Sequence, residues 1–175
     1  FIDWAEANGY TLDYFTMHDL DENPQALVPY RLSVVVGHDE YISAEMRQAV
    51  ENQLDAGGNH ARFAGNAIWQ VRIEDDGTTF VAYKHAESDP LFGTDRSALV
   101  SDAWDCDAVG RPITTTFGLT GTGVIHVRFG GGAPRSAAGF TVYRPWHWSL
   151  KDTDLYFGDL IGGHPDYVVC YEVDG

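Results

Sequence analysis

Cysteine is scarce in this 175-residue chain: Cys106 and Cys170 are its only two, and they lack the close spacing of a zinc knuckle or a disulfide framework. A cytoplasmic location is therefore expected. Basic residues are scarce as well, with 11 Lys and Arg against 26 Asp and Glu, which gives a formal charge of -15. That charge repels nucleic acid and anionic membranes, so neither is expected as a partner.

Long apolar runs and nucleophile motifs are also missing. No stretch of about 18 apolar residues occurs and no basic-then-apolar leader opens the chain, so no membrane span is expected. No Gly-x-Ser-x-Gly occurs, and Cys170 has no glycine-flanked turn, which argues against a serine or cysteine triad. The stretch GTGVIHVRFGGG lacks the Gly-Lys-Ser/Thr ending of a phosphate loop, so a β-turn is expected there.

The chain does have the apolar residues for a sizeable core. Its apolar content is 44%, and its length suits one domain of about 100 to 200 residues, so a single domain over residues 1–175 is predicted. The chain begins at Phe1 without a methionine and ends on EVDG directly after a strand-like run. We therefore expect it to be a piece of a longer protein.

The first half alternates helix and strand signals. A helix ending at Asn8-Gly9, a strand over 10–15, a short helix from Pro24 capped by Asn23 and a strand over 31–36 are predicted. Ser43 then caps a helix in which apolar residues recur every four positions, at Met46, Val50 and Leu54. These alternations predict an α/β fold with a parallel, doubly wound sheet, which binds ligands at the carboxyl ends of its strands.

Strand signals take over after this helix. A strand over 61–66 is expected, followed by a hairpin formed by WQVRIE and TTFVAYK around Asp75-Asp76-Gly77. From about residue 88 to 150, glycines separate short β-prone runs and no helical period persists. We predict a β-rich, loop-rich insertion there.

Polar side chains gather where the strand VVV ends. His38, Asp39, Glu40 and Tyr41 follow it directly, and they can ligate a cation, relay a proton or merely cap the next helix. Tyr83, next to Lys84 at another expected strand end, is either a packing residue or a ligand. Glu172 lies in an otherwise apolar strand, and burial there requires a metal, a proton or an arginine as partner.

The same residues carry a family resemblance. The run from GHDEY through GGN and GN to WQVR, followed by VAYK and DP, resembles the large (beta) subunit of N,N-dimethylformamidase and its relatives. GFTVYRPWHWSLKDTDLYFGDLIGG and the closing YEVDG resemble the same family. The resemblance covers nearly the whole chain and is weakest at about 95–135.

The resemblance implies a flavodoxin-like core of the class I glutamine amidotransferase type. It also implies one ferric ion held by two tyrosinates and a glutamate, which match Tyr41, Tyr83 and Glu172, and it implies hydrolysis of a small N-substituted formamide. His38, Asn66 and Lys84 are the expected catalytic residues around the metal. A small subunit is an expected partner, and further catalytic residues and homo-oligomer contacts are expected from sequence outside this chain.

Two departures from the family pattern change the expected substrate, and one segment leaves a second interpretation open. Ile42 stands where the resemblance leads us to expect tryptophan, and the residues before WQVR are shortened to NAI, so a different pocket and a substrate other than dimethylformamide are expected. The acidic, glycine-rich and tryptophan-bearing segment from Gly110 to Trp148 resembles a binding surface as much as an enzyme wall. The alternative is a non-catalytic binding module of a larger protein.

Overall fold

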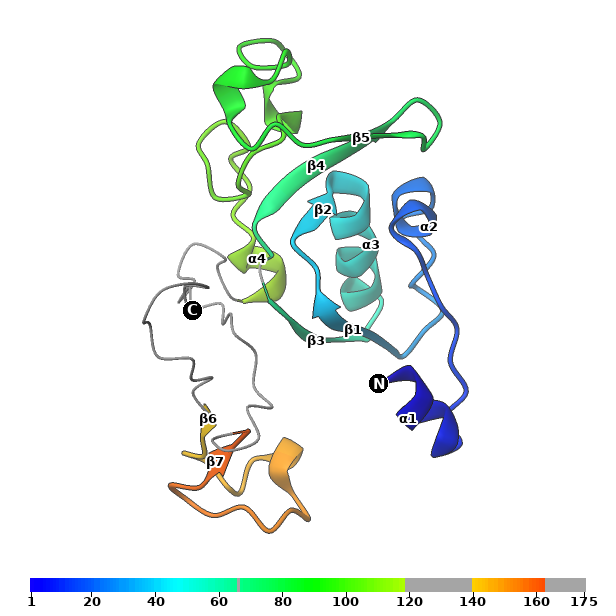
Figure 1. The fold of residues 1–175 in the computed structure, drawn as a ribbon, viewed down its shortest axis with the longest axis vertical. Helices are drawn as coiled ribbons and strands as arrows, with labels where there is room; N and C mark the ends of the chain where they lie inside the picture. The colour runs from blue at the N-terminus through cyan, green and yellow to red at the C-terminus, as the bar shows by residue number, and fades with distance from the viewer. Residues whose placement is uncertain (66, 119–139, 163–175) are drawn as a thin grey trace, which may run out of the picture. The chain divides into compact units, whose positions relative to one another are not determined.

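The computed structural model describes residues 1–65, 67–118 and 140–162. The chain divides into two compact units, one of residues 1–123 together with 174–175 and the other of residues 124–173. Figure 1 shows the helices and strands of both units. Within the described residues, no helix is both long and apolar enough to cross a membrane.

A β-α-β arrangement lies at the centre of the first unit (Figure 1). Strand β1 (Leu32–His38) runs parallel to β3 (Asn59–Gly65). After a short break each strand resumes, so that β2 (Tyr41–Ser43) pairs in parallel with β4 (Trp69–Glu74). Helix α3 (Ala44–Asp55) follows β2 directly and leads back to the start of β3. Tyr41 therefore opens a short strand just before the helix.

The predicted hairpin is confirmed. Strand β5 (Thr79–Val81) pairs antiparallel with β4, with Ile73 opposite Phe80. The turn between them has positive φ angles at Asp75, Asp76 and Gly77, a conformation that Asp and Gly adopt more readily than most residues.

Helix α3 is also confirmed, with the predicted cap. The Ser43 side chain accepts a hydrogen bond from the Met46 backbone N–H at 3.1 Å, and the chain leaves the helix through Gly57 at a φ of 85°. Met46 and Val50 are buried, as their spacing predicts. Leu54, the third residue of that series, is 37% exposed because it lies on the last turn.

The amino-terminal segment departs from the predictions. Helix α1 (Ile2–Ala7) ends before Asn8-Gly9 as expected. The strand expected over 10–15 and the helix expected from Pro24 are wrong: residues 10–16 have no regular structure, and residues 24–29 form turns. Helix α2 (Met17–Glu22) forms instead, because Thr16 and Asp19 satisfy each other's backbone N–H groups in a capping box.

The main core lies where the loop after β5 covers the sheet and α3. Its buried side chains include Ile42, Met46, Val100, Trp104 and Ile113. Arg47 of α3 is fully buried beside them, with its guanidinium 4.7 Å from the centre of the Trp104 ring. Its N–H groups donate to the carbonyls of Arg111 and Pro112 and to Thr115 and Thr116, and so fasten the short helix α4 (Thr114–Phe117) to α3.

The flavodoxin-like prediction is wrong for the described residues. They form a two-stranded parallel sheet and a three-stranded mixed sheet in the first unit, with a two-stranded antiparallel sheet in the second. Apart from α3, each α-helix has only four to six residues. No continuous sheet flanked by helices arises there, because two of the segments predicted to alternate as strand and helix form loops and turns instead.

The β-rich character predicted for residues 88–150 is wrong over residues 88–118. From residue 86 to 118 the chain forms the 3₁₀ helices η1 (Ala86–Ser88) and η2 (Ser97–Leu99), loops, and α4. One isolated bridge joins Ala103 to Trp69. The segment is rich in loops, as predicted, and uses side-chain hydrogen bonds instead of a strand ladder.

The second unit is described over residues 140–162. Strand β6 (Phe140–Thr141) pairs antiparallel with β7 (Leu160–Ile161), and a 3₁₀ helix, η4 (Trp148–Leu150), lies between them in sequence. Val142 is buried, whereas the Trp146 and Trp148 side chains are 78% and 81% exposed.

Candidate functional site

Tyr41 lies in a polar cluster at the break between β1 and β2. Its hydroxyl oxygen accepts a hydrogen bond from the Lys84 ammonium at 2.5 Å, and its ring packs edge-on against Phe80 of β5, with 5.7 Å between the centroids. The hydrogen bond joins residues that are 43 positions apart in sequence. Two of the residues that the sequence analysis selected separately are therefore brought into direct contact.

Glu40 organises the other side of this contact. Its Oε1 accepts a hydrogen bond from the indole N–H of Trp69 at 2.8 Å and lies 3.5 Å from the Lys84 ammonium. That ammonium also lies over the rings of Tyr41 and Trp69, at 4.7 and 5.2 Å from their centroids. The second carboxylate oxygen is 3.9 Å from Nδ1 of His38. We call Tyr41, Glu40, Trp69, Lys84 and His38 the Tyr41 cluster.

Lys84 enters the cluster through an unusual backbone conformation. Its φ is 62°, in the left-handed region that residues other than glycine seldom occupy. The hydrogen bond to Tyr41, supported by the charge of Glu40, raises the pKa of the Lys84 ammonium above its usual value. Lys84 is therefore positively charged at neutral pH, beside an oxygen that would become negative on binding a cation.

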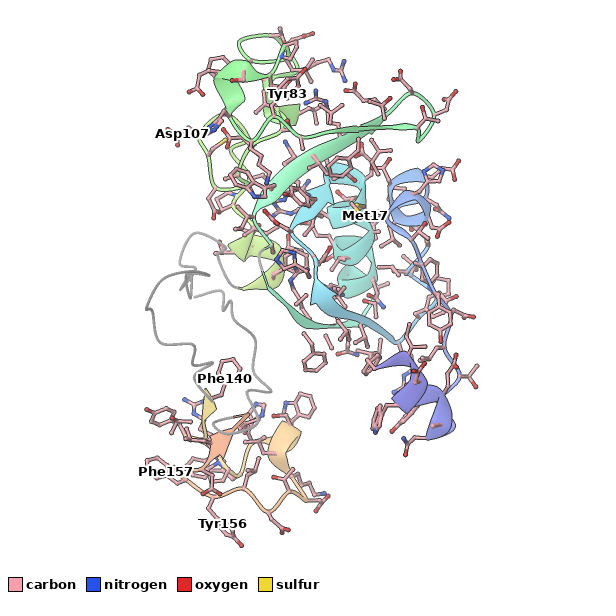
Figure 2. The ribbon with its side chains drawn as sticks, in the orientation of Figure 1. Met17, Tyr83, Asp107, Phe140, Tyr156 and Phe157 are labelled. Carbon is pink, nitrogen blue, oxygen red and sulfur yellow. The ribbon has the colours of Figure 1, made fainter. Side chains whose placement is uncertain are left out.

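Tyr83 is positioned by its backbone. It lies between β5 and η1 (Figure 2) and is 43% exposed, and its backbone N–H donates to Oγ of Ser101 at 2.7 Å. Ser101 is buried and donates its own backbone N–H to the Asp89 carboxylate at 2.8 Å. The guanidinium of Arg72 on β4 donates two hydrogen bonds to the same carboxylate, at 2.6 and 3.2 Å. This chain of contacts ties the loop that carries Tyr83 and Lys84 to the sheet.

The Asp89 carboxylate is ionised in this set of contacts. Burial opposes its charge, but hydrogen bonds from Arg72 and from the backbone N–H groups of Ser101 and Leu91 outweigh that effect and lower its pKa to about 2.

The structure thus brings three of the predicted site residues, Tyr41, Lys84 and His38, into one cluster. Tyr41 and Lys84 are in contact, and His38 is joined to them through Glu40. Tyr83 is the chain neighbour of Lys84 and is half exposed. Asn66 and Glu172 lie outside the described residues. Within residues 1–65, 67–118 and 140–162, no group of three or more His, Cys, Asp or Glu side chains is placed to hold a metal.

Sequence reasoning missed the partners that hold these residues. Glu40 is one of the four residues expected to ligate a cation, relay a proton or cap the next helix, but its contacts with Lys84 and Trp69 were not predicted. Trp69 was predicted only as part of a strand. Asp89 and Pro90 belong to the DP element of the family resemblance, but nothing in their spacing indicates Arg72 or Ser101 as partners.

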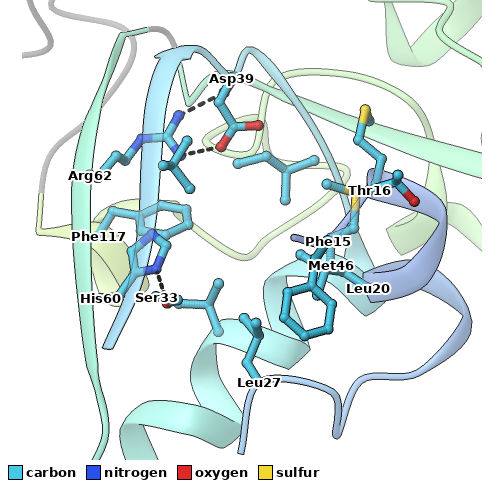
Figure 3. A pocket seen from close by; sticks show the side chains of 14 residues that line it. Phe15, Thr16, Leu20, Leu27, Ser33, Asp39, Met46, His60, Arg62 and Phe117 are labelled. Atoms are coloured by element: carbon cyan, nitrogen blue, oxygen red, sulfur yellow. Dashed lines mark hydrogen bonds and ion pairs between the residues drawn. The ribbon is translucent and has the colours of Figure 1, made fainter. Parts of the chain in front are cut away.

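Sequence reasoning also missed a pocket of about 190 Å³ in the first unit (Figure 3). It lies between the paired strands β1 and β3 and the helices α2 and α3. Nine of its fourteen lining residues are apolar, and polar groups from Ser33, Asp39, His60 and Arg62 gather on the strand side. A salt bridge between Arg62 and Asp39, at 2.5 Å, closes one end.

A comparison with protein families bears on these residues. A family model described as N,N-dimethylformamidase beta subunit-like, C-terminal, matches residues 1–175. The chain belongs to this family. No curated protein matches the chain. The N,N-dimethylformamidase beta subunit-like resemblance seen in the motifs is therefore confirmed over residues 1–175.

Proposed function

We propose that this chain provides a metal site for the hydrolysis of small N-substituted amides of the formamide type. The observation that carries the proposal is the Tyr41 hydroxyl held at 2.5 Å by the Lys84 ammonium, in a member of the N,N-dimethylformamidase beta subunit-like family. Tyr41, Tyr83 and Glu172 are the proposed ligands of one ferric ion. The role of Glu172 rests on the resemblance of YEVDG, since that residue lies outside the described part.

The donor set suits a ferric ion. Fe³⁺ is a hard cation that prefers anionic oxygen, and phenolate and carboxylate both supply it. The Lys84 ammonium, 2.5 Å from the Tyr41 oxygen, would offset the negative charge of a phenolate ligand at that position. When bound, the ion would act as a Lewis acid on an amide carbonyl.

The surrounding residues have distinct proposed roles. Lys84 neutralises the charge on Tyr41, and Glu40 holds Lys84 in place from the other side. His38, whose side chain is 55% exposed and 3.9 Å from Glu40, is placed to exchange a proton with a substrate at the edge of the cluster. Asn66 is proposed to orient the amide.

The proposed partners and location rest on the family. A beta subunit-like chain is consistent with a multi-subunit enzyme. We propose a small subunit and further copies of this chain as partners, and a cytoplasmic location.

A non-catalytic binding module is the second candidate. The exposed Trp146 and Trp148 side chains in the second unit favour it, because exposed aromatic residues are typical of binding surfaces. Such a module would need neither Tyr41 nor Tyr83.

The two candidates are separated by formate release from a small N-substituted formamide. Iron-loaded protein, assayed with the proposed small subunit and the sequence that flanks this chain, is expected to release formate. Tyr41→Phe is expected to lower the rate by about 10²-fold or more, because it removes a ligand oxygen. The control is Tyr156→Phe, a change at a tyrosine that is 71% exposed in the second unit. Equal rates for wild type and Tyr41→Phe would reject the hydrolase site.

A further inference from the structure

The pocket beside β1 and β3 is separate from the Tyr41 cluster. Tyr41 and Ile42 are successive residues of β2, so their side chains point to opposite faces of the strand. Ile42 lines the pocket, whereas Tyr41 faces Phe80 and Lys84. A molecule in the pocket would therefore lie on the other side of β2 from the proposed metal.

The size and lining of the pocket define what fits. Its volume of about 190 Å³ exceeds the roughly 150 Å³ at which an apolar protein cavity accepts benzene. Phe15 just before α2, Leu20 of α2 and Leu27 of the turns after it line one side of the pocket (Figure 3). Met46 and Val50 line it from α3. Such walls favour an apolar body of the size of one aromatic ring.

The charges in the pocket favour an uncharged ligand. Arg62 and Asp39 neutralise each other, since Arg62 donates to the Asp39 carboxylate at 2.5 Å and to its backbone carbonyl at 2.6 Å. Burial, and then the positive charge of Arg62, lowers the pKa of His60 below its usual value, so the imidazole is neutral at pH 7. A charged ligand would have no free counter-charge among these groups.

A chain of hydrogen bonds fixes the tautomer of His60. The Gln53 amide N–H donates to the Tyr30 carbonyl at 3.0 Å, which turns Gln53 Oε1 toward Ser33. The Ser33 hydroxyl donates to that oxygen at 2.6 Å, so its own oxygen is left to accept from His60 Nδ1–H at 2.8 Å. In the neutral ring, Nε2 then carries a lone pair, and it is buried without a partner among the described residues.

We propose that this pocket binds a small, neutral, mainly apolar molecule that carries one hydrogen-bond donor, an O–H or N–H, directed to Nε2 of His60. Phenol has the right size and chemistry to represent the class. The Phe117 ring packs against the imidazole, with 5.5 Å between the two centroids. Because Nε2 is buried, the donor of the ligand reaches it only when side chains around the imidazole move on binding. Burial of the apolar ring and satisfaction of the Nε2 lone pair together drive binding.

The test compares phenol with benzene by calorimetric titration of the purified protein. Phenol is expected to bind with one molecule per chain and about fivefold to tenfold more tightly than benzene, which cannot donate to Nε2. His60→Phe is expected to reduce phenol binding to the level of benzene. The matched control is His147→Phe, at an exposed histidine of the second unit, which is expected to change neither affinity.

A second variant locates the site independently of His60. Val35→Phe places a ring in the pocket from β1 and is expected to abolish binding of both molecules, with circular dichroism confirming the fold. Failure of wild type to bind either ring, equal affinities for the two rings, or phenol binding that survives both variants would each overturn the proposal.

Discussion

Lys84 is the residue on which the electrostatics of the candidate site depend. It holds a left-handed backbone conformation, and its ammonium is shared between the Tyr41 hydroxyl at 2.5 Å and Glu40 at 3.5 Å. Backbone strain of this kind costs on the order of 1 to 3 kcal/mol and persists where surrounding contacts fix the conformation. Here those contacts are the hydrogen bond to Tyr41 and the cation–π contacts of the ammonium with the Tyr41 and Trp69 rings.

Replacement of Lys84 by methionine tests this role in iron-loaded protein. The positive charge lowers the energy of the phenolate electrons, so its loss is expected to move the tyrosinate-to-iron absorption band to longer wavelength. A visible spectrum measures the shift. Lys151 is the only other lysine, is exposed, and provides the matched control as Lys151→Met. An unmoved band in Lys84→Met would contradict contact between Lys84 and a ligand tyrosine.

At the scale of elements, the loop after β5 is held to the sheet by buried polar contacts more than by strand pairing. Arg72 on β4 binds Asp89, which binds Ser101, and the Ser101 hydroxyl receives the Tyr83 backbone N–H. Because Asp89 is fully buried and paired, removal of its charge leaves Arg72 with only the more exposed Glu74 carboxylate, at 2.7 Å, as its counter-charge.

Asp89→Asn is therefore expected to lower the free energy of unfolding at pH 7 by about 2 kcal/mol or more, given a native pKa of about 2. The folded pKa lies below that of the unfolded chain, so the stabilisation is complete above about pH 4 and is lost as the pH falls toward 2. Urea unfolding at pH 7 and at pH 2 measures both effects. Asp76→Asn, in the exposed hairpin turn, is the control. A variant as stable as wild type at pH 7 would show that the Arg72–Asp89 pair contributes nothing.

Local signals predicted the elements that depend on local contacts. Helix α3 has a serine cap and a four-residue apolar repeat, and the β4–β5 hairpin has an Asp-Asp-Gly turn, so both were predictable. The strand expected over 10–15 failed because alternation alone does not provide a partner strand. Helix α2 was missed although Thr16 and Asp19 carry its capping signal, because a six-residue helix has almost no period to detect.

At the scale of the whole molecule, long-range pairing was the part that the sequence could not provide. The strands β1 and β3 pair as a β-α-β pattern predicts, but no local signal indicates that β1 and β2 are separate segments or that the sheets remain small. For the site, the sequence predicts Tyr41 and Lys84 as candidate residues at the ends of two different strands. Only the fold shows that they touch, and that Glu40 and Trp69 complete the contact.

The most direct test of the proposed site is a titration of ferric ion into metal-free protein, followed by visible absorbance. Tyrosinate coordination predicts a band that grows to a sharp end point at one equivalent per chain and is absent from the Tyr41→Phe/Tyr83→Phe double variant. Glu172→Gln is expected to weaken binding at the same site. A titration that produces no band in the wild type, or the same band in the double variant, would contradict a ferric centre built on these two tyrosines.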